Sequence, residues 1–458
     1  MPKALTPLLL LVAGVFAART AVLPAAAPAA QRRPTFAADI APILLERCAS
    51  CHRPGQPAAF SLLSYDDAKA KGKEIAAATQ ARTMPPWLAT QGPGFPALKA
   101  DSRLTEKEIT AIATWVKNGM PSGDLRKAPT PPPYPVTWPL GTPDLTSEVT
   151  RIVGISAGNH SEARNVVIPV EFPTDLWVSG VDYQRGDAGV VKFARVFLAP
   201  PDLRIRDDDA LPGVGGLLGS GSLENYADQM FAAARGLTNL GAWVPSINRH
   251  LLPDNLAIRI PARWNVVVQL HLQAGSQDAV ENGRVGIYFA KPSARRAIKP
   301  IDVPPALGIA SNLSIPAGVA RHVMRETFVL PVNVDAVGAR AYANALGHDM
   351  TMTAELPDRS VRSLLRIDRW DPAWPDSYYF ATPIALPKGT TLKVEIAYDN
   401  SADNPRNLFS PPRRIGWGRV SVGEVGGMTL LIAGPSTEDA KALDDAAAQH
   451  LRNQLLKR

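Results

Sequence analysis

The stretch Val266-Val267-Val268-Gln269-Leu270-His271-Leu272-Gln273 indicates the fold class of most of this chain. Its even-numbered residues are all aliphatic, and its odd-numbered residues after Val267 are polar. Alternation with a period of two is typical of a β-strand that buries one face. The range Leu392–Tyr398 repeats the pattern, and the region around both stretches, about 280 residues, is long enough for two stacked sandwiches. We therefore predict tandem all-β sandwiches over residues 146–435.

The composition of the 458-residue chain fits a β-rich fold and excludes several other classes. Hydrophobic residues make up 46% and charged residues 20%, which excludes a disordered chain. Proline, at 43 residues, is about twice as frequent as average, and this argues against a mostly helical protein. The formal charge of +7 is spread among acidic residues without a basic run, so we expect no nucleic-acid partner.

The N-terminus has the features of a secretory signal. Lys3 precedes an apolar run, and small residues continue to Ala30. The run from Leu8 to Ala18 has about 11 residues, against the roughly 20 that a membrane-spanning helix needs, and Arg19 ends it. We expect residues 1–30 to be removed as a signal peptide. The mature protein would then be periplasmic or otherwise exported, with no transmembrane anchor.

Both cysteines of the chain lie in one motif, Cys48-Ala49-Ser50-Cys51-His52. Two cysteines separated by two residues and followed directly by histidine form the attachment pattern of c-type haem. On one helical turn the two thiols can reach the two vinyl groups of haem, while His52 points its imidazole at the iron. A zinc site would need further Cys or His nearby, and Arg53-Pro54-Gly55 supplies none. We expect one covalent haem c, held by Cys48 and Cys51, with His52 as an axial ligand.

The second axial ligand is expected from the loop between two helices that flank the motif. Apolar spacing predicts one helix ahead of Cys48 and another over Thr105–Asn118. Met84 lies between them in Thr83-Met84-Pro85-Pro86-Trp87, where two prolines stiffen the backbone. We choose Met84 as the ligand to the haem iron, with Met120 as the competitor. A His/Met pair fills both axial positions and suits electron transfer.

Changes in composition divide the chain into five parts. A stiff proline-rich spacer begins at Lys127 and separates a small all-α domain from the sandwiches, so we expect proteolysis at Arg126 or Lys127 to release two pieces. Within the sandwiches, the glycine-rich range 211–221 and the helical pattern over 223–234 are interpreted as a surface insertion. The expected parts are a signal peptide at 1–30, a cytochrome c domain at 34–124, a linker at 125–145, a double β-sandwich at 146–435 and a C-terminal docking or tail helix at 436–458.

Six stretches spread over both domains carry a resemblance to a known family. They are Cys48–Leu62, Met84–Trp87, Leu364–Trp374, Leu386–Thr390, Tyr398–Asn407 and Pro411–Trp417. In these stretches the chain resembles bacterial fusions of a cytochrome c domain with a type II copper, ascorbate-dependent monooxygenase domain. The relatives of that domain are the peptidylglycine hydroxylating and dopamine β-monooxygenases. The resemblance implies two jelly-roll-like sandwiches, each carrying one copper across an open cleft, with the cytochrome appended.

The resemblance implies three copper ligands in the first sandwich, and two of them are replaced in this chain. Where the family has two consecutive histidines in a Val-Val-His-His strand, this chain has Val190-Val191-Lys192-Phe193. Lys192 and Phe193 therefore stand at the positions of the two imidazole ligands. The third histidine of that copper matches His271, on the polar face of its strand.

The second copper has also lost its histidine pair. Where the family has His-x-His before Leu-Gly, this chain has Tyr342-Ala343-Asn344, and the thioether ligand matches Met428. Divalent copper prefers imidazole ligands. The two retained ligand positions belong to different coppers, so we expect no bound copper.

Other histidines offer little to rebuild a copper site. His348 is four residues beyond Asn344, and in an extended strand that separation is about 13 Å, so its ring would need a register slip to replace the lost pair. We interpret His348, His250 and His322 as surface or hydrogen-bonded loop residues. His160 and His450 carry no signal.

Two functions from different classes follow. In the first, the protein is an exported electron-transfer cytochrome whose sandwiches have lost copper and serve as a binding or docking module, with a redox partner protein or a small electron donor or acceptor. In the second, it is an ascorbate-dependent copper monooxygenase that hydroxylates a C–H bond with rebuilt ligands and electrons from the haem. The residues favour the first, because activity depends on the site and not on the fold. A replacement catalytic site has no Ser/His/Asp signature to support it.

Overall fold

The fold was analysed in a computed structural model. The residues that it describes are 33–54, 58, 60–99, 101–134, 138–148, 153–158, 161–169, 172–186, 190–201, 238–243, 251–253, 256–291, 296–305, 311, 313–417 and 423–456. The predicted signal peptide, the insertion at 211–221 and 223–234, His160 and His250 lie outside these residues. None of the helices within the described ranges is both long enough and apolar enough to cross a membrane.

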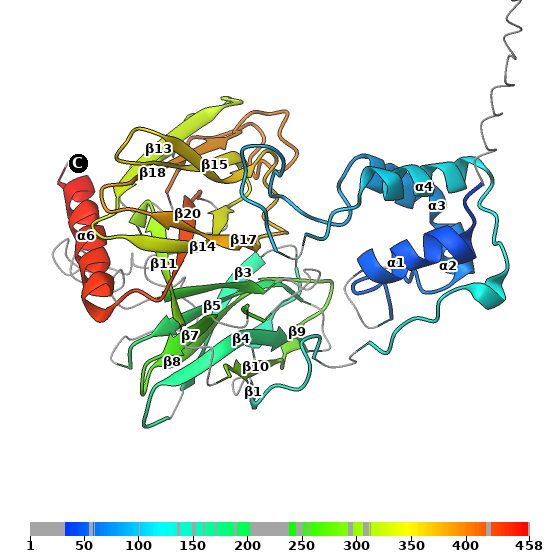
Figure 1. The fold of residues 1–458 in the computed structure, drawn as a ribbon, viewed down its shortest axis with the longest axis horizontal. Helices are drawn as coiled ribbons and strands as arrows, with labels where there is room; N and C mark the ends of the chain where they lie inside the picture. The colour runs from blue at the N-terminus through cyan, green and yellow to red at the C-terminus, as the bar shows by residue number, and fades with distance from the viewer. Residues whose placement is uncertain are drawn as a thin grey trace, which may run out of the picture.

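Short helices form a separate N-terminal domain, drawn in blue and cyan in Figure 1. They are the π-helical turn η1 (Phe36–Ile40), α1 (Ala41–Arg47), α2 (Tyr65–Ala70), α3 (Gly72–Gln80), α4 (Glu106–Lys117) and the 3₁₀ turn η2 (Leu125–Lys127). α4 begins at a capping box, because Thr105 and Glu108 each accept a hydrogen bond from the other's backbone N–H. Its buried residues Ile109, Ile112 and Trp115 join the core formed by η1 and α1.

The rest of the chain is built mainly of β-strands. In chain order they are β1 (Leu145–Glu148), β2 (Val153–Ile155), β3 (Ser161–Pro169), β4 (Leu176–Gln184), β5 (Val191–Ala199), β6 (Thr238–Trp243), β7 (Leu256–Ile260), β8 (Asn265–Gln273), β9 (Ala279–Glu281), β10 (Arg284–Phe289), β11 (Arg296–Val303), β12 (Ser314–Ile315), β13 (His322–Val329), β14 (Val334–Ala343), β15 (Gly347–Glu355), β16 (Val361–Ile367), β17 (Ser377–Leu386), β18 (Thr391–Tyr398), β19 (Ile415–Gly416) and β20 (Gly426–Ala433). The prediction of all-β sandwiches is confirmed.

The strands form two sandwiches, which we call lobe 1 (β1 to β10) and lobe 2 (β11 to β20). In lobe 1, the sheet β3-β8-β5-β6 packs on the sheet β1-β10-β4-β7, and in lobe 2 the sheet β13-β18-β15-β16 packs on β11-β20-β14-β17. A parallel pairing of β7 with β11 joins one sheet of each lobe into a continuous eight-stranded sheet. The two lobes therefore lie side by side, as Figure 1 shows.

Strand β8, on which the fold prediction was based, is buried on both faces. Its even-numbered aliphatic residues lie in the core of lobe 1, as alternation predicts. Its polar residues Gln269 and His271 are buried as well, on the face that also carries Arg195 of β5, which contacts lobe 2. The sequence pattern did not predict this second burial, because the neighbouring lobe that covers the face lies far away in the chain.

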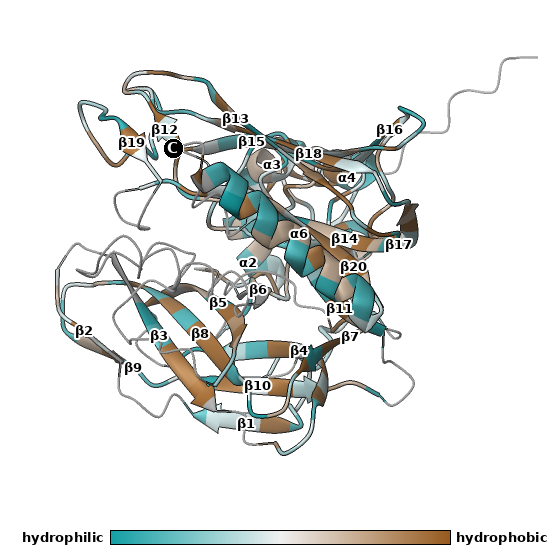
Figure 2. Cartoon of the chain, turned by 90° about the vertical axis from the view of Figure 1, so that its left-hand side faces the viewer, coloured by the Kyte–Doolittle hydropathy of each residue, from teal (hydrophilic) through white to brown (hydrophobic). Residues whose placement is uncertain are grey.

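The C-terminal helix α6 (Thr437–Leu455) packs on lobe 2. It begins at Ser436, whose side chain accepts a hydrogen bond from the N–H of Asp439. Lys299 of β11 pairs with Asp444, and His450 lies 3.7 Å from Glu326 of β13. With Leu443 buried in the lobe 2 core, α6 covers the side of the sandwich between β11 and β13, where Figure 2 shows it in front.

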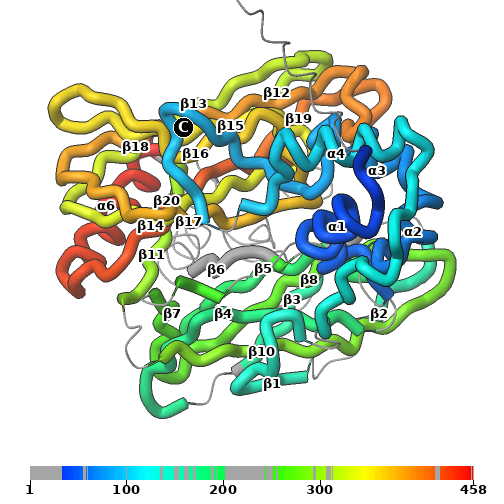
Figure 3. The backbone as a smooth tube through the Cα atoms, turned by 45° about the vertical axis from the view of Figure 1, so that its right-hand side comes forward, coloured from blue at the N-terminus to red at the C-terminus, as the bar shows by residue number. Residues whose placement is uncertain are grey.

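A long connection in the helical domain crosses onto lobe 2, and we call residues 87–99 the strap. The strap leaves α3 just after Met84 and returns to α4, and Figure 3 shows it as a blue segment over lobe 2. Its Thr90 N–H donates to the Arg366 carbonyl at 2.8 Å, and its Lys99 N–H donates to the Tyr379 carbonyl at 2.8 Å. These acceptors belong to β16 and β17, which are edge strands of the two lobe 2 sheets. The strap thus covers two sheet edges that would otherwise stay unpaired.

Aromatic packing reinforces the strap. The ring of Trp87 meets the ring of Tyr378 edge to face at 5.1 Å, and the N–H of Leu88 donates to the Tyr378 hydroxyl at 3.3 Å. The proline-rich spacer is therefore one of two physical connections between the helical domain and the sandwiches.

We predict that cleavage in the spacer leaves the two parts bound together. Limited trypsin treatment should cut at Arg126 or Lys127, which are exposed, yet the helical fragment should co-elute with the sandwich fragment in gel filtration because the strap stays paired with lobe 2. This corrects the expectation of two separable pieces. Thr90→Pro with Lys99→Pro removes two strap donors and should let the helical fragment elute alone. A wild-type helical fragment that elutes at its own size would contradict the prediction.

Candidate functional sites

The haem motif occupies a single turn at the end of α1. The N–H of Cys48 donates to the Leu44 carbonyl at 2.9 Å, and the N–H groups of Cys51 and His52 donate to the Cys48 carbonyl at 3.1 and 2.9 Å. This backbone pattern places Cys48, Cys51 and His52 on one turn. Neither cysteine is in a disulfide.

The ring of His52 is held through one nitrogen. Its Nδ1 lies 3.3 Å from the carbonyl oxygen of Phe60, to which it can donate, and the Phe60 ring lies 4.6 Å away. A backbone carbonyl on Nδ1 fixes the tautomer that leaves Nε2 with a lone pair for a metal. Burial lowers the pKa of His52, which favours the same neutral form.

The Cys48 thiol lies against the core of the helical domain. Burial raises the pKa of Cys48 to about 12, because the core of the helical domain disfavours a thiolate. A thiol of this kind is a poor thiolate ligand for zinc and resists thiol exchange. The donor set Cys48, Cys51 and His52 fits covalent attachment of a haem.

The two candidate methionines have different surroundings. Met120 packs against the helical core, and a Cβ added to Gly72 would lie 2.4 Å from its sulfur, so Met120 fills space beside α3. Met84 is half-buried and lies beyond α3, where the strap begins. Its backbone N–H donates to the Ala78 carbonyl at 3.4 Å. Met120 therefore has a packing role, and ligation by Met84 stays a prediction.

The copper-like position of lobe 1 is filled by an aromatic stack. Phe193 and His271 are cross-strand partners in β5 and β8, and their rings stack at 3.9 Å with an angle of 14°. His271 Nε2 hydrogen-bonds the Gln269 side-chain oxygen at 3.1 Å, and Gln269 in turn donates to Asn165 at 3.2 Å. The side chain of Lys192 lies outside the described residues. One ring nitrogen of His271 is thus engaged, and the face of its ring is covered.

Arg195 stands beside this stack and joins the two lobes. Its guanidinium lies 3.8 Å from the ring centre of Tyr342 in lobe 2 and 5.7 Å from that of Phe193 in lobe 1. The side chain is only 3% exposed, and burial lowers its pKa to about 9, so it stays charged at neutral pH. That charge also lowers the pKa of His271, after the larger effect of burial. A cation beside His271 opposes the binding of a second cation there.

The copper-like position of lobe 2 is not assembled. Tyr342 and Asn344 lie on one face of β14, where the Tyr342 hydroxyl donates to the Asn344 side-chain oxygen at 2.8 Å. Met428 is the cross-strand partner of Ala341, so it lies on the opposite face, fully buried in the lobe 2 core. The structure therefore separates Met428 from the two residues with which the family pattern groups it.

A buried carboxylate positions the end of β14. Glu424 is 1% exposed and accepts hydrogen bonds from the backbone N–H groups of Asn344 (2.5 Å), Leu346 (2.8 Å) and Val425 (3.0 Å). Burial raises its pKa to about 7 despite these bonds. No sequence pattern pointed to this residue, because an isolated glutamate carries no motif.

The remaining histidines do not rebuild a copper site in the described part of the chain. His348 begins a new strand of the other sheet after the turn at Asn344–Leu346, so the assumption of one extended strand was wrong. Its exposed ring contacts Asp349, which also pairs with Arg321. Within the described ranges, no group of three or more His, Cys, Asp or Glu side chains is placed to hold a metal ion.

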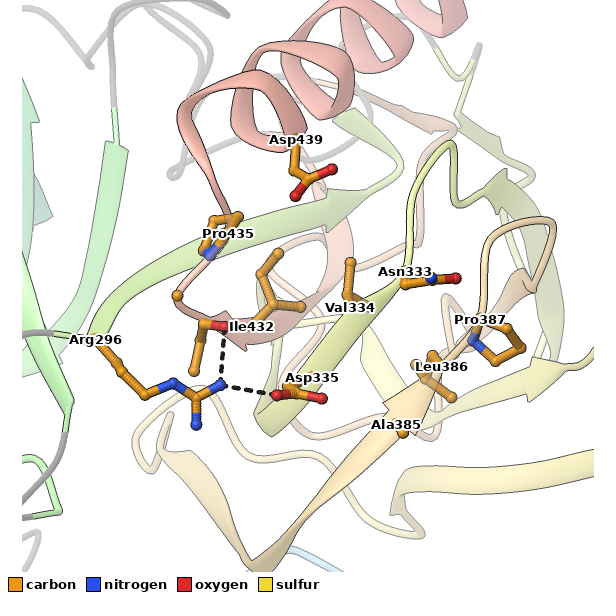
Figure 4. A pocket seen from close by; sticks show the side chains of 12 residues that line it. Arg296, Asn333, Val334, Asp335, Ala385, Leu386, Pro387, Ile432, Pro435 and Asp439 are labelled. Atoms are coloured by element: carbon orange, nitrogen blue, oxygen red, sulfur yellow. Dashed lines mark hydrogen bonds and ion pairs between the residues drawn. The ribbon is translucent and has the colours of Figure 1, made fainter.

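A surface groove of about 420 Å³ opens between α6 and the ends of β14 and β17. Figure 4 shows Arg296 at one side, where it donates to Asp335 at 2.8 Å and to the Ala433 carbonyl at 3.4 Å. The ion pair with Asp335 offsets the charge of the arginine.

Comparisons with known proteins leave the family open. No family model matches the chain, and no curated protein matches it. Solved structures with some likeness include PNGF-II (9% identity, 62% of this chain, 66% of that chain, TM-score 0.26), PNGase F, a glycosylasparaginase from Flavobacterium meningosepticum (10%, 64%, 97%, 0.30), and the VP2 subviral particle of infectious bursal disease virus (11%, 62%, 74%, 0.17). The match spans just under two thirds of PNGF-II. Overlaps this low carry no argument about function.

We predict that Glu424 makes the fold less stable as the pH rises from about 4.5 to 7. Because its folded pKa of about 7 exceeds the unfolded value, the folded chain binds more protons in this window, and stability falls by up to roughly 3 kcal/mol as the proton is lost. Urea unfolding at pH 5 and pH 7.5 should show a smaller loss of stability in Glu424→Gln than in the wild type. Glu355→Gln, at an exposed carboxylate, should behave like the wild type. Equal losses in all three would contradict the prediction.

Proposed function

We propose that this chain is an exported c-type haem electron-transfer protein whose β-sandwich lobes serve as a binding or docking module. The observation that carries the proposal is the single turn that presents Cys48, Cys51 and His52, with His52 Nδ1 held by the Phe60 carbonyl. Export through the N-terminal signal is part of the proposal, because an exported location is consistent with a covalently attached haem.

In this function, Cys48 and Cys51 hold the haem as thioethers, and His52 with Met84 holds its iron. Haem, when bound, supplies one-electron transfer. The polypeptide keeps the His52 ring oriented through Phe60 and keeps the Cys48 thiol in apolar surroundings. The electrons pass between the haem and a redox partner protein or a small donor or acceptor.

The strap makes the sandwiches part of this proposal. It begins three residues after Met84, and its pairing with β16 and β17 ties the ligand loop to lobe 2. The strap therefore links lobe 2 to the loop that carries Met84.

Copper chemistry does not fit the residues of the lobes. In lobe 1, Phe193 covers the ring of His271 and Arg195 adds a positive charge. In lobe 2, Met428 and the pair Tyr342 and Asn344 lie on opposite faces of one sheet. We therefore derive no reaction at either position.

We predict one covalent haem per chain with Met84 as axial ligand. In the oxidised full-length protein, Met84→Ala should abolish the weak far-red thioether–iron band and lower the reduction potential, on the order of 0.1 V or more. Met120→Leu keeps the packing beside Gly72 and should retain the band. Absence of the band from the wild type, or its survival in Met84→Ala, would make the assignment wrong.

We also predict that the full-length protein holds no stoichiometric copper and has no ascorbate-dependent monooxygenase activity. The protein should be titrated with copper and dialysed, and its iron and copper should be counted by mass spectrometry, alongside His271→Ala and His348→Ala. Iron alone is expected in all three. One tightly bound copper that disappears in either variant would instead support the monooxygenase function.

A further inference from the structure

Arg195 is a buried cation whose hydrogen-bonding capacity is unused. Its side chain is 3% exposed, and its Nε, Nη1 and Nη2 atoms have no hydrogen-bond partner among the residues that the structure describes. An arginine carries five N–H donors in a planar fork, and leaving them unpaired away from water is costly. Among the residues that the structure describes, no carboxylate offsets the effect of burial on this guanidinium.

The polar groups around Arg195 are paired with one another instead. In lobe 1, Asn165, Gln269 and His271 form a chain of side-chain hydrogen bonds across β3 and β8. In lobe 2, Tyr342 donates to Asn344, and Asn344 donates to the Gly423 carbonyl. Because these side chains hydrogen-bond to one another within their own lobe, the guanidinium donors between the lobes are available to a bound ligand.

The aromatic rings limit the directions from which a ligand can approach the guanidinium of Arg195. Tyr342 lies against the guanidinium at 3.8 Å, so the ring occupies one side of it. The N–H donors point outward in the guanidinium plane, and a planar carboxylate can accept two of them there in a bidentate pair. Phe193, stacked on His271, provides an apolar surface on the lobe 1 side.

We propose that Arg195 is the centre of a site between the two lobes that binds a small organic carboxylate. The aromatic surfaces of Phe193 and Tyr342 favour a carboxylate with an apolar or aromatic body over inorganic phosphate, which is more strongly hydrated and has only this one arginine to meet it. This proposal specifies the class of ligand that the sandwiches bind. It rests on their proposed role as a binding module and not on the electron-transfer role of the helical domain.

The experiment uses the full-length protein in metal-free buffer at constant ionic strength. Benzoate serves as the probe, benzamide as its neutral analogue, and inorganic phosphate as the competing oxyanion. Binding is measured by isothermal titration calorimetry and by the midpoint of thermal unfolding. The variants are Arg195→Met, which removes the charge, Arg195→Lys, which keeps the charge without the planar fork, and Arg296→Met, which removes one exposed charge elsewhere.

We expect benzoate to bind the wild type and Arg296→Met equally and to raise their unfolding midpoints, while benzamide does neither. Arg195→Lys should bind at least tenfold more weakly, and Arg195→Met should not bind. Without benzoate, Arg195→Met should unfold at the wild-type midpoint or above it, because an apolar residue of similar volume replaces an uncompensated charge.

Three results would overturn the proposal. They are benzoate binding that survives in Arg195→Met, phosphate binding as tight as benzoate binding, and a wild type that binds none of the probes. A marked fall in the midpoint of Arg195→Met without benzoate would also count against it, since that would reveal a partner for the arginine within the chain. The haem spectrum of the same samples is recorded separately, so a failure of the electron-transfer function is distinguishable from a failure of this site.

Discussion

The pairing of β7 with β11 is the constraint on which the arrangement of the lobes depends. Among the described residues, Leu256 with Arg296 and Ala257 with Ala297 form this parallel contact, which merges one sheet of each sandwich. A small apolar cluster of Leu256 with residues of β14 and β20 supports the junction. With the lobes joined at this edge, the outer face of the β5 and β8 sheet faces lobe 2, where Arg195 contacts Tyr342.

Burial of that face explains its unusual chemistry. Polar side chains are tolerated between the lobes because Asn165, Gln269 and His271 satisfy one another, which avoids the cost of about 1 to 3 kcal/mol for each unpaired group. Arg195 is different. Its stack on Tyr342 contributes on the order of 2 kcal/mol when desolvated, against the several kcal/mol that burial of an unpaired ion costs.

The strap links the helical domain to the same body. Its backbone hydrogen bonds cover the edges of β16 and β17, and its start lies next to Met84. One segment thus caps lobe 2 and, in the proposed function, holds the loop that carries Met84. This shared use explains why a connection between two short helices is so long.

Local patterns in the chain were enough to predict the motif turn at Cys48–His52, the capped helices and the period-two strands, because hydrogen bonds and apolar contacts within a few residues decide each of them. Three features could not be read in this way. They are the burial of the second face of β8, the location of Met428 on the opposite face of the sheet from Tyr342, and the contact of Arg195 with Tyr342. All three depend on which strands pair and on which side of the sheet each residue lies. Those contacts join residues far apart in the chain, such as Phe193 with His271 and Ala341 with Met428, and a change of register by one residue reverses the face. Only the folded arrangement of both lobes therefore shows that Arg195 lies beside Phe193 and His271, at the position where the family resemblance implies a copper ion.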